Sequence, residues 1–243
     1  MTKKFILAVC VAAVAFAACE KENNDKVHLA TMYGEITSMG MTVTGTTNYT
    51  WENDKLVKVV DSSFLNGNLI AVLDETLVYE GGVCIERYSA DGTYHHYYSY
   101  EGGRLKKAVD IMRGDTSAIT EIMEWTSNNK VAKLKFTTGD AVVYAHYTWQ
   151  DGDLKEIVHE RVSPTAETKT YSYSYDNHTS VYVDFPLAYL VQDIYHLIKD
   201  SKHNVTLPDH TLNYEKGRLV SDFNDDGSEK IYYTYTDGTG RRK

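Results

Sequence analysis

The sequence predicts a mainly β protein, a long antiparallel meander of repeated β-hairpins that forms one strongly curved sheet. The first observation is a recurring pattern of two aromatic residues one position apart, a polar turn, and a Leu or Val that opens the next strand. The second is spacing, because successive anchor aromatics mostly lie 21 to 28 residues apart, the length of two strands and two turns. A sheet of roughly fourteen strands curls, since open sheets seldom exceed about ten strands, and we expect a half-barrel or a near-closed barrel.

The chain begins with a segment typical of a secretory signal peptide, residues 1–18. Lys3 and Lys4 precede an apolar run of 14 residues that ends at Ala18. The run is too short to favour a transmembrane helix, which needs roughly 20 residues. Small residues directly before Cys19 resemble a bacterial lipobox, which implies cleavage before Cys19 and a lipid on its thiol. Ordinary secretion with an incidental cysteine is the alternative.

Residues 19–29 are predicted to be the lipidated Cys and a polar tether, and their acidic start resembles the surface-export signal of Bacteroidota lipoproteins. A tether that faces the periplasm is the alternative. Without residues 1–18 the chain has 34 acidic and 23 basic residues, because Lys3 and Lys4 are removed, and a net charge of −11. Such a charge argues against nucleic acid as a partner. Cys84 would be the last cysteine left, so we expect a small buried hydrophobic side chain and no disulfide.

The repeats fill one predicted domain, residues 30–243. Alternation supports strands: from 143 to 149, one face carries Val143, Ala145, Tyr147 and Trp149. Asp-Gly pairs such as Asp151-Gly152 supply the positive φ angles that tight hairpins require. The anchor aromatics are, in order, Trp51, Tyr79, Tyr100, Trp125, Trp149, Tyr175, Tyr214 and Tyr235.

A longer step of 39 residues between Tyr175 and Tyr214 contains a predicted helical insert, residues 184–210. Pro186 suits the first position of a helix, which we place at about 186–199. One apolar stripe follows at helical spacing: Leu187, Leu190, Val191, Ile194, Leu197 and Ile198. We expect the stripe to pack on the concave side of the sheet. The alternative is an exposed helix that binds a partner.

Two segments, Tyr98-Ser99-Tyr100-Glu101-Gly102-Gly103-Arg104-Leu105 and Tyr214-Glu215-Lys216-Gly217-Arg218-Leu219, resemble the YD-type hairpin repeats of Rhs-like proteins. Together with the lipobox and the late helix followed by Ser201, His203, Asn204 and Pro208, they make the chain similar to a family of Bacteroidota lipoproteins of unknown function. The resemblance implies a β-rich fold and a location in the cell envelope. It implies no activity, ligand or catalytic residue.

The sequence contains no catalytic motif: no G-x-S-x-G elbow, no H-E-x-x-H, no P-loop and no G-x-G-x-x-G before a helix. We therefore expect a protein that is not an enzyme and that uses no cofactor. The alternative is an enzyme that acts on polysaccharide, which needs two carboxylates about 5–10 Å apart in a cleft. Glu121, Glu124 and Asp184 are among the acids that could supply them.

A weak calcium candidate lies at Asp222, Asn224 and Asp226, where oxygen-bearing side chains alternate as they do at the start of a calcium loop. Tyr233 stands at the twelfth position, where a calcium loop needs Glu. A hairpin turn with solubilising acids explains the segment equally well, and the sequence otherwise predicts no metal site.

The equivalent positions of five anchor aromatics suggest a binding surface. Curvature would align them as a ladder whose flat rings could stack on sugars. The alternative is that equivalent repeat positions build the core. The five residues are Trp51, Tyr100, Trp125, Trp149 and Tyr214.

The sequence thus predicts an outer-membrane lipoprotein that is held through Cys19, either displayed on the cell surface or facing the periplasm. Its function would be a non-catalytic binding or assembly module for a glycan or an envelope protein, and we expect a monomer. A transmembrane barrel is a third hypothesis. The short strands, the charges on both faces and the basic C-terminus, Arg241-Arg242-Lys243, argue against it.

Overall fold

The computed structural model describes residues 26–191, 196–237 and 239. The predicted signal peptide, Cys19 and most of the predicted tether lie outside the described residues.

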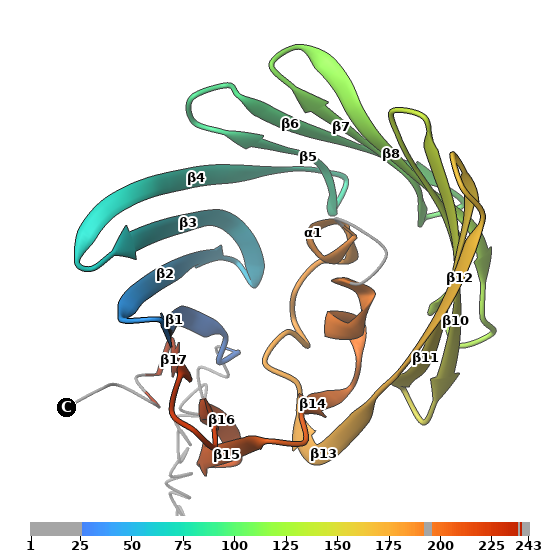
Figure 1. Cartoon of the computed structure of the whole chain (residues 1–243). Helices are drawn as coiled ribbons and strands as arrows, with labels where there is room; N and C mark the ends of the chain where they lie inside the picture. The colour runs from blue at the N-terminus through green and yellow to red at the C-terminus, as the bar shows by residue number, and fades with distance from the viewer. Residues whose placement is uncertain (1–25, 192–195, 238, 240–243) are drawn as a thin grey trace, which may run out of the picture.

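The prediction of a curved antiparallel meander is confirmed by one 15-stranded sheet, which wraps around the helical segment (Figure 1). Across the sheet, β12 to β1 lie side by side in reverse sequence order, and β17, β16 and β15 follow next to β1. The two parts are joined because β1 pairs with β17. Its strands are β1 (Leu29–Ser38), β2 (Met41–Glu52), β3 (Lys55–Leu65), β4 (Asn68–Glu80), β5 (Val83–Ser89), β6 (Tyr94–Glu101), β7 (Arg104–Met112), β8 (Asp115–Trp125), β9 (Val131–Thr138), β10 (Ala141–Gln150), β11 (Asp153–Ser163), β12 (Glu167–Ser172), β15 (His210–Glu215), β16 (Arg218–Asn224) and β17 (Glu229–Tyr235).

Two further strands, β13 (Ser174–Thr179) and β14 (His203–Thr206), form a separate antiparallel pair. Figure 1 shows this pair between β12 and β15, the two edges of the large sheet. The sheet therefore curves most of the way around, and the β13–β14 pair occupies the remaining arc.

One end of the sheet carries a repeated hydrogen bond from an aromatic side chain to the backbone. The Tyr79 hydroxyl donates to the Leu56 carbonyl oxygen at 2.9 Å, and the Trp149 indole N–H donates to that of Val131 at 2.7 Å. Each bond closes the open end of a hairpin whose turn lies at the opposite end of the strands. The same bond joins Trp51 to Leu29, Tyr100 to Cys84, Tyr175 to Leu154 and Tyr235 to Leu219. We call this end of the sheet the aromatic rim.

A basic side chain beside the acceptor residue covers the aromatic ring in several repeats. The Arg104 guanidinium lies 5.6 Å from the centre of the Trp125 ring, and the Lys55 ammonium lies 5.3 Å from that of Tyr79. Cation–π attraction of this kind contributes about 0.5–1 kcal/mol at exposed sites. The Gly-Arg-Leu pattern of the sequence therefore has a structural meaning: Arg covers the ring, and Leu enters the core. Further pairs are Lys130 with Trp149, Lys155 with Tyr175 and Arg218 with Tyr235.

A β-bulge next to the rim resets the alternation of side chains in each repeat. Leu56 pairs with Trp51 while Lys58 pairs with Thr50, so Val57 is the extra residue of β3. Residues three positions apart, instead of two, then point into the concave core. Such buried pairs are Leu56 with Val59, Leu105 with Ala108, Val131 with Leu134 and Leu154 with Ile157.

The insert lies on the concave side, as predicted (Figure 1), but the predicted continuous helix over 186–199 is wrong. The helix α1 spans only Leu187–Leu190, Pro186 is its N-cap, and Val191 leaves the helical conformation with φ −85° and ψ 73°. A short 3-10 helix, η1, follows at His196–Asp200. The four consecutive residues 188–191 are all buried, so burial here is not confined to one apolar stripe. Ile194 lies outside the described residues.

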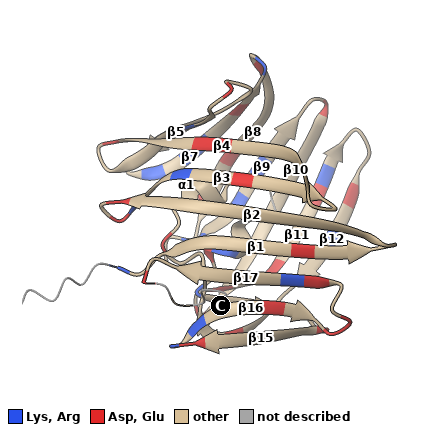
Figure 2. Cartoon of the chain, turned by 90° about the vertical axis from the view of Figure 1, so that its left-hand side faces the viewer, with Lys and Arg blue, Asp and Glu red and all other residues tan. Residues whose placement is uncertain are grey.

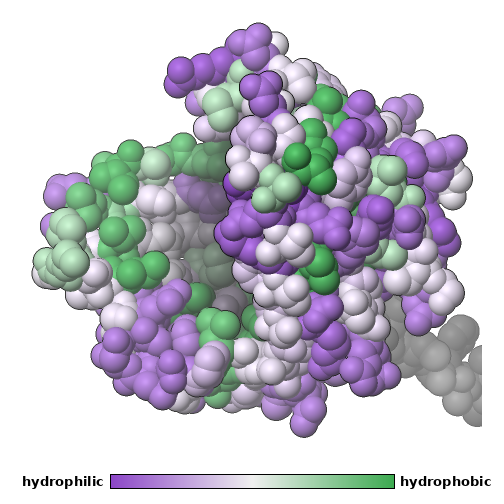
Figure 3. Space-filling model, turned by 45° about the vertical axis from the view of Figure 1, so that its right-hand side comes forward, coloured by the Kyte–Doolittle hydropathy of each residue, from purple (hydrophilic) through white to green (hydrophobic). Residues whose placement is uncertain are grey.

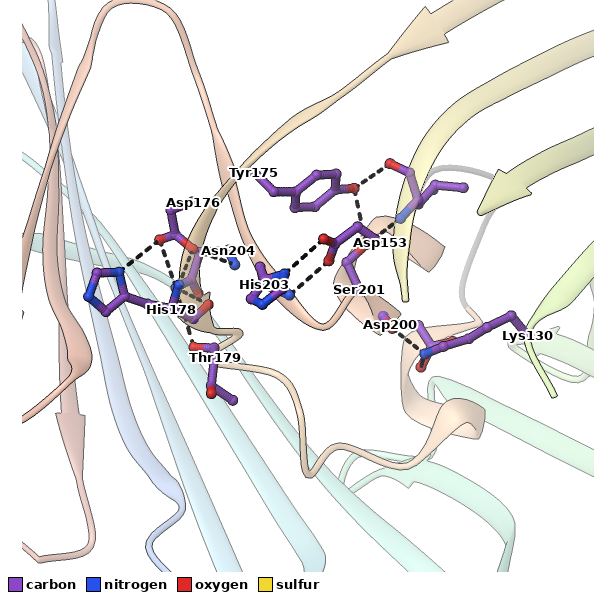
Figure 4. Close-up of polar contacts among 11 residues, drawn as sticks. Lys130, Asp153, Tyr175, Asp176, His178, Thr179, Asp200, Ser201, His203 and Asn204 are labelled. Carbon is purple, nitrogen blue, oxygen red and sulfur yellow. Dashed lines mark hydrogen bonds and ion pairs between the residues drawn. The ribbon is translucent and has the colours of Figure 1, made fainter. Parts of the chain in front are cut away.

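A polar network holds the insert to the sheet (Figure 4). The Asp153 carboxylate accepts the backbone N–H of His203 at 2.9 Å and lies 2.8 Å from Nδ1 of its ring. The Ser201 hydroxyl accepts the backbone N–H of Leu154, and the Asn204 side chain binds the backbone of Val181 and Thr179. These contacts explain the polar residues that follow η1 in the sequence: they fasten the insert to β11 and β13.

Candidate functional site

The five aromatics predicted as a ladder all lie half-buried on the aromatic rim, but four of them are in contact with other side chains that cover part of the ring. Trp51 stacks on the His28 ring at 4.3 Å and also meets the edge of Phe185. Trp149 lies under Lys130, Trp125 lies under Arg104, and Tyr214 stacks on His178 at 3.8 Å. The structure therefore does not present the five rings as one continuous ladder.

Two of the five, Tyr100 and Trp125, nevertheless line one cleft together with Tyr79. This rim cleft has a volume of about 360 Å³ and lies between the aromatic rim and the start of α1. Arg104 and Asn129 add polar groups to its wall, and Arg104 donates a hydrogen bond to the Asn129 side-chain oxygen. The lining contains no Asp or Glu; it is completed by Gly82, Val83, Cys84, Gly103, Leu105, Pro186, Leu187 and Ala188.

The hydroxyl groups of Tyr79 and Tyr100 are already bonded to backbone carbonyl oxygens, so these rings are fixed in place. Burial is the main reason that the pKa of Tyr100 is raised to about 12, and it also raises the pKa of the Cys84 thiol to about 11. Cys84 is a free, buried cysteine in β5, as the sequence predicts. The rim cleft thus offers rigid flat rings and two polar side chains, which suit stacking and hydrogen bonding more than proton transfer.

A second cavity, of about 340 Å³, lies inside the curve of the sheet, and we call it the concave cavity. Sequence reasoning missed it. The space-filling view shows that the molecule is deeply hollowed, with hydrophobic surface along the border of the hollow (Figure 3). Strands β1 to β6, α1 and η1 supply the lining, which consists of Met32, Thr47, Tyr49, Asp61, Leu73, Glu75, Arg87, Tyr94, His96, Tyr189 and Lys199.

A row of charged side chains crosses four strands at the wall of the concave cavity. Arg87 pairs with His96 in register, and His96 pairs with Asp110, while Glu75 comes from β4. Arg87 Nη2 lies 3.0 Å from His96 Nε2, and His96 Nδ1 lies 2.7 Å from Asp110. Because a guanidinium can only donate, His96 Nε2 must accept, and Nδ1 carries the proton toward Asp110. This geometry requires a neutral His96.

The signal that could have revealed this cavity is the repeat itself. Arg87 stands three residues after Cys84, the position that Val59, Ala108, Leu134 and Ile157 occupy in other repeats. Simple alternation from Cys84 would direct Arg87 outward. The bulge in β5, between the pairs Val78–Glu86 and Tyr79–Cys84, directs it inward instead.

The calcium candidate forms a hairpin turn in the structure. Asp222 pairs with His210 at 2.7 Å, Asn224 bonds to Ser228, and Asp226 accepts the backbone N–H of Ser228. Within the described part of the chain, no cluster of three or more His, Cys, Asp or Glu side chains could hold a metal ion. We do not develop calcium binding into a proposal.

The acids considered for catalysis are not brought together. Glu121 pairs with Lys135 across β8 and β9, whereas Asp184 lies 3.2 Å from His28, before α1. Glu124 is exposed at the end of β8. The three residues therefore form no carboxylate pair in a shared cleft.

No family model matches the chain, and no curated protein matches it in sequence. Among solved structures, the chain is similar to one described as a porin-like protein from Bacteroides uniformis ATCC 8492. The TM-score is 0.56 at 13% identity, and the alignment covers 85% of this chain and 96% of that chain. A likeness at this identity shows a shared β fold. In the described ranges of this chain, no helix is long and apolar enough to cross a membrane.

The buried tyrosines predict loss of stability at alkaline pH. Burial raises the pKa of Tyr100 and Tyr175 from 10.0 to about 12. The folded chain thus holds these protons when the unfolded chain has lost them, so the stability they contribute is complete below pH 10 and falls as pH rises toward 12. Denaturant unfolding followed by circular dichroism, at stepped pH with tyrosinate absorbance recorded in parallel, measures this. A free energy of unfolding that stays constant up to pH 12 would contradict the assignment.

Proposed function

We propose that this protein is a lipid-anchored protein of the cell envelope whose non-catalytic function is to bind a glycan in the rim cleft. The observation that carries the proposal is the convergence of Tyr79, Tyr100 and Trp125 in one cleft beside Arg104 and Asn129. Flat aromatic rings suit the apolar faces of sugar rings, while guanidinium and amide groups bond to sugar hydroxyls. The residues that line the rim cleft include no Asp or Glu. Because hydrolysis of a glycosidic bond uses a pair of carboxylates, this lining supports binding without hydrolysis.

The position of the N-terminal strand supports a tethered domain. Strand β1 begins at the aromatic rim, so the preceding polypeptide joins the sheet at the same end as the rim cleft (Figure 2). A lipid on Cys19, followed by the polar residues 20–26, would then hold the domain at an outer-membrane surface. The acidic stretch after Cys19 supports display on the cell surface, and the net charge of −11 disfavours nucleic acid as a partner.

The charged residues on the outer face of the sheet favour attachment by a lipid tether over insertion of the sheet into the bilayer. Lys58 pairs with Asp74 at 2.9 Å across β3 and β4, and Lys135 pairs with Glu121 across β8 and β9. Positions of Lys, Arg, Asp and Glu are coloured along many strands of the sheet in Figure 2. A charge that faces hydrocarbon near the bilayer midplane costs about 2–4 kcal/mol. A monomer attached through lipid alone avoids this cost.

Replacing Trp125 with Ala should remove glycan binding, because it deletes the largest ring of the rim cleft. We expect a loss of about tenfold in affinity, because a stacked ring contributes about 0.5–1.5 kcal/mol in addition to the area it buries, and about 1.4 kcal/mol corresponds to tenfold. Binding of a panel of soluble host, dietary and bacterial glycans to the full chain is measured by isothermal titration calorimetry in a detergent without a sugar head group.

The matched control is Trp149→Ala, which removes an equivalent repeat residue that does not line the rim cleft. This variant should bind with unchanged affinity once its folding has been checked by circular dichroism. If no glycan binds the unmodified chain, or if both variants lose affinity equally, the rim cleft is not the binding site.

Replacing Cys19 with Ser should release the protein from membranes. The thiol is the proposed site of lipid attachment, and each buried CH₂ of an acyl chain contributes about 0.8 kcal/mol to membrane binding. Cells that express either form are labelled with a palmitate analogue and fractionated. The original chain should carry label in the membrane fraction, and Cys19→Ser should be unlabelled and soluble. Cys84→Ser serves as the control, and membrane retention of Cys19→Ser would exclude a lipid anchor at this residue.

A further inference from the structure

We propose that the concave cavity is a second binding site, separate from the rim cleft, and that it takes one neutral sugar unit. The central residues are Arg87 and Asp61, which both line the cavity and come from β5 and β3. The proposal does not depend on the rim cleft, because the residues that line the two sites are different.

The first argument is the identity of the residue at a core position of the repeat. Arg87 is only 3% exposed, and it stands where four other repeats place an apolar side chain. Burial of a charged group is costly, and a well-packed apolar residue often serves a fold equally well or better. The fold itself therefore does not require a guanidinium here. The corresponding apolar residues are Val59, Ala108, Leu134 and Ile157.

The second argument is incomplete hydrogen bonding of the same side chain. Arg87 Nη2 donates to His96, but Nε and Nη1 are buried without a hydrogen-bond partner among the described residues. Nε lies 3.3 Å from a Glu75 oxygen, as an ion pair without hydrogen-bond geometry. Buried polar groups almost always have partners, so each exception requires an explanation. Both atoms are shielded in the structure, so an oxygen atom of a ligand in the cavity would supply the missing acceptor once the Arg87 side chain turns toward it.

The third argument is the carboxylate on the other side of the cavity. Asp61 lines it, and the described part of the chain offers this carboxylate no hydrogen bond or ion pair. A carboxylate only accepts and a guanidinium only donates, whereas a hydroxyl group does both. Neighbouring hydroxyls of one sugar ring can donate to Asp61 and accept from Arg87. Hydrogen bonds to charged groups are stronger than neutral ones, so this pair can select a polyol.

The charge balance of the wall favours a ligand without net charge. Asp61 and Glu75 are acidic and Arg87 and Lys199 are basic, while His96 is neutral in this geometry. Three tyrosine side chains complete the wall, and aromatic rings suit the apolar face of a sugar. The volume of about 340 Å³ is at the lower end of the range of roughly 300–1,000 Å³ for small-molecule sites. The three rings belong to Tyr49, Tyr94 and Tyr189.

The test measures binding of single sugars to the full chain in a detergent without a sugar head group. D-glucose, D-galactose and N-acetyl-D-glucosamine are the neutral probes, and D-glucuronate and L-glutamate are the charged comparators. Saturation-transfer NMR detects contact, and its titration gives a dissociation constant. We expect a neutral sugar to bind, and Asp61→Asn to weaken it by at least about tenfold, because the amide loses the charge-assisted bond.

Two control variants keep the result interpretable. Glu86→Gln changes a carboxylate of the same strand as Arg87 that pairs with His95 and does not line the cavity, so affinity should be unchanged. Trp125→Ala should also leave it unchanged, because that residue belongs to the rim cleft. Thermal melting of each variant confirms folding.

Three outcomes would overturn the proposal. One is that no neutral sugar contacts the protein, and another is that a charged comparator binds more tightly than every neutral sugar. The third is that affinity is lost in Trp125→Ala and kept in Asp61→Asn, which would assign the single sugar to the rim cleft. Failure of glycan binding in the rim cleft alone leaves the result for the concave cavity unaffected.

Discussion

The hydrogen bond from a rim aromatic to a backbone carbonyl is the contact on which the rest of this structure depends. A hairpin is held at one end by its turn, and its other end would be free to separate. In this chain Tyr79, Tyr100 and Trp149 each close that end by binding the backbone near the start of the neighbouring strand. The adjacent bulge then turns the strand so that residues three positions apart enter the core. Curvature of the sheet follows from this unit repeated along the chain.

The two candidate sites arise where the repeat departs from its own rule. In the rim cleft, Tyr100 and Trp125 meet the start of α1 and leave space, whereas Trp51 is covered by His28 and Phe185. In the concave cavity, the core position of one repeat holds Arg87 instead of an apolar residue. A repeat protein whose core positions are mostly filled by apolar side chains can tolerate one position at which a buried charge lowers stability. Such positions are where function is expected.

The sequence predicts the fold well because its signals are periodic. Alternation and Asp-Gly turns define the strands, and the number of strands implies a curved sheet, all of which the structure shows. The prediction of one helix over 186–199 is wrong because α1 ends at Leu190, and the buried residues 188–191 do not follow one apolar stripe. Of the predicted ladder, only Tyr100 and Trp125 share a cleft, since ring positions depend on contacts with distant residues such as His28. The concave cavity escapes prediction because the bulge in β5 reverses the expected direction of Arg87.

The most direct test of the central claim removes single rim hydroxyls. Tyr79→Phe, Tyr100→Phe and Tyr235→Phe keep each ring and delete only its bond to the backbone, and Tyr97→Phe on the exposed side of β6 is the control. Equilibrium urea unfolding should show that each rim variant loses about 1 kcal/mol of stability and that the control loses much less. Rim variants that are as stable as the control would contradict the account.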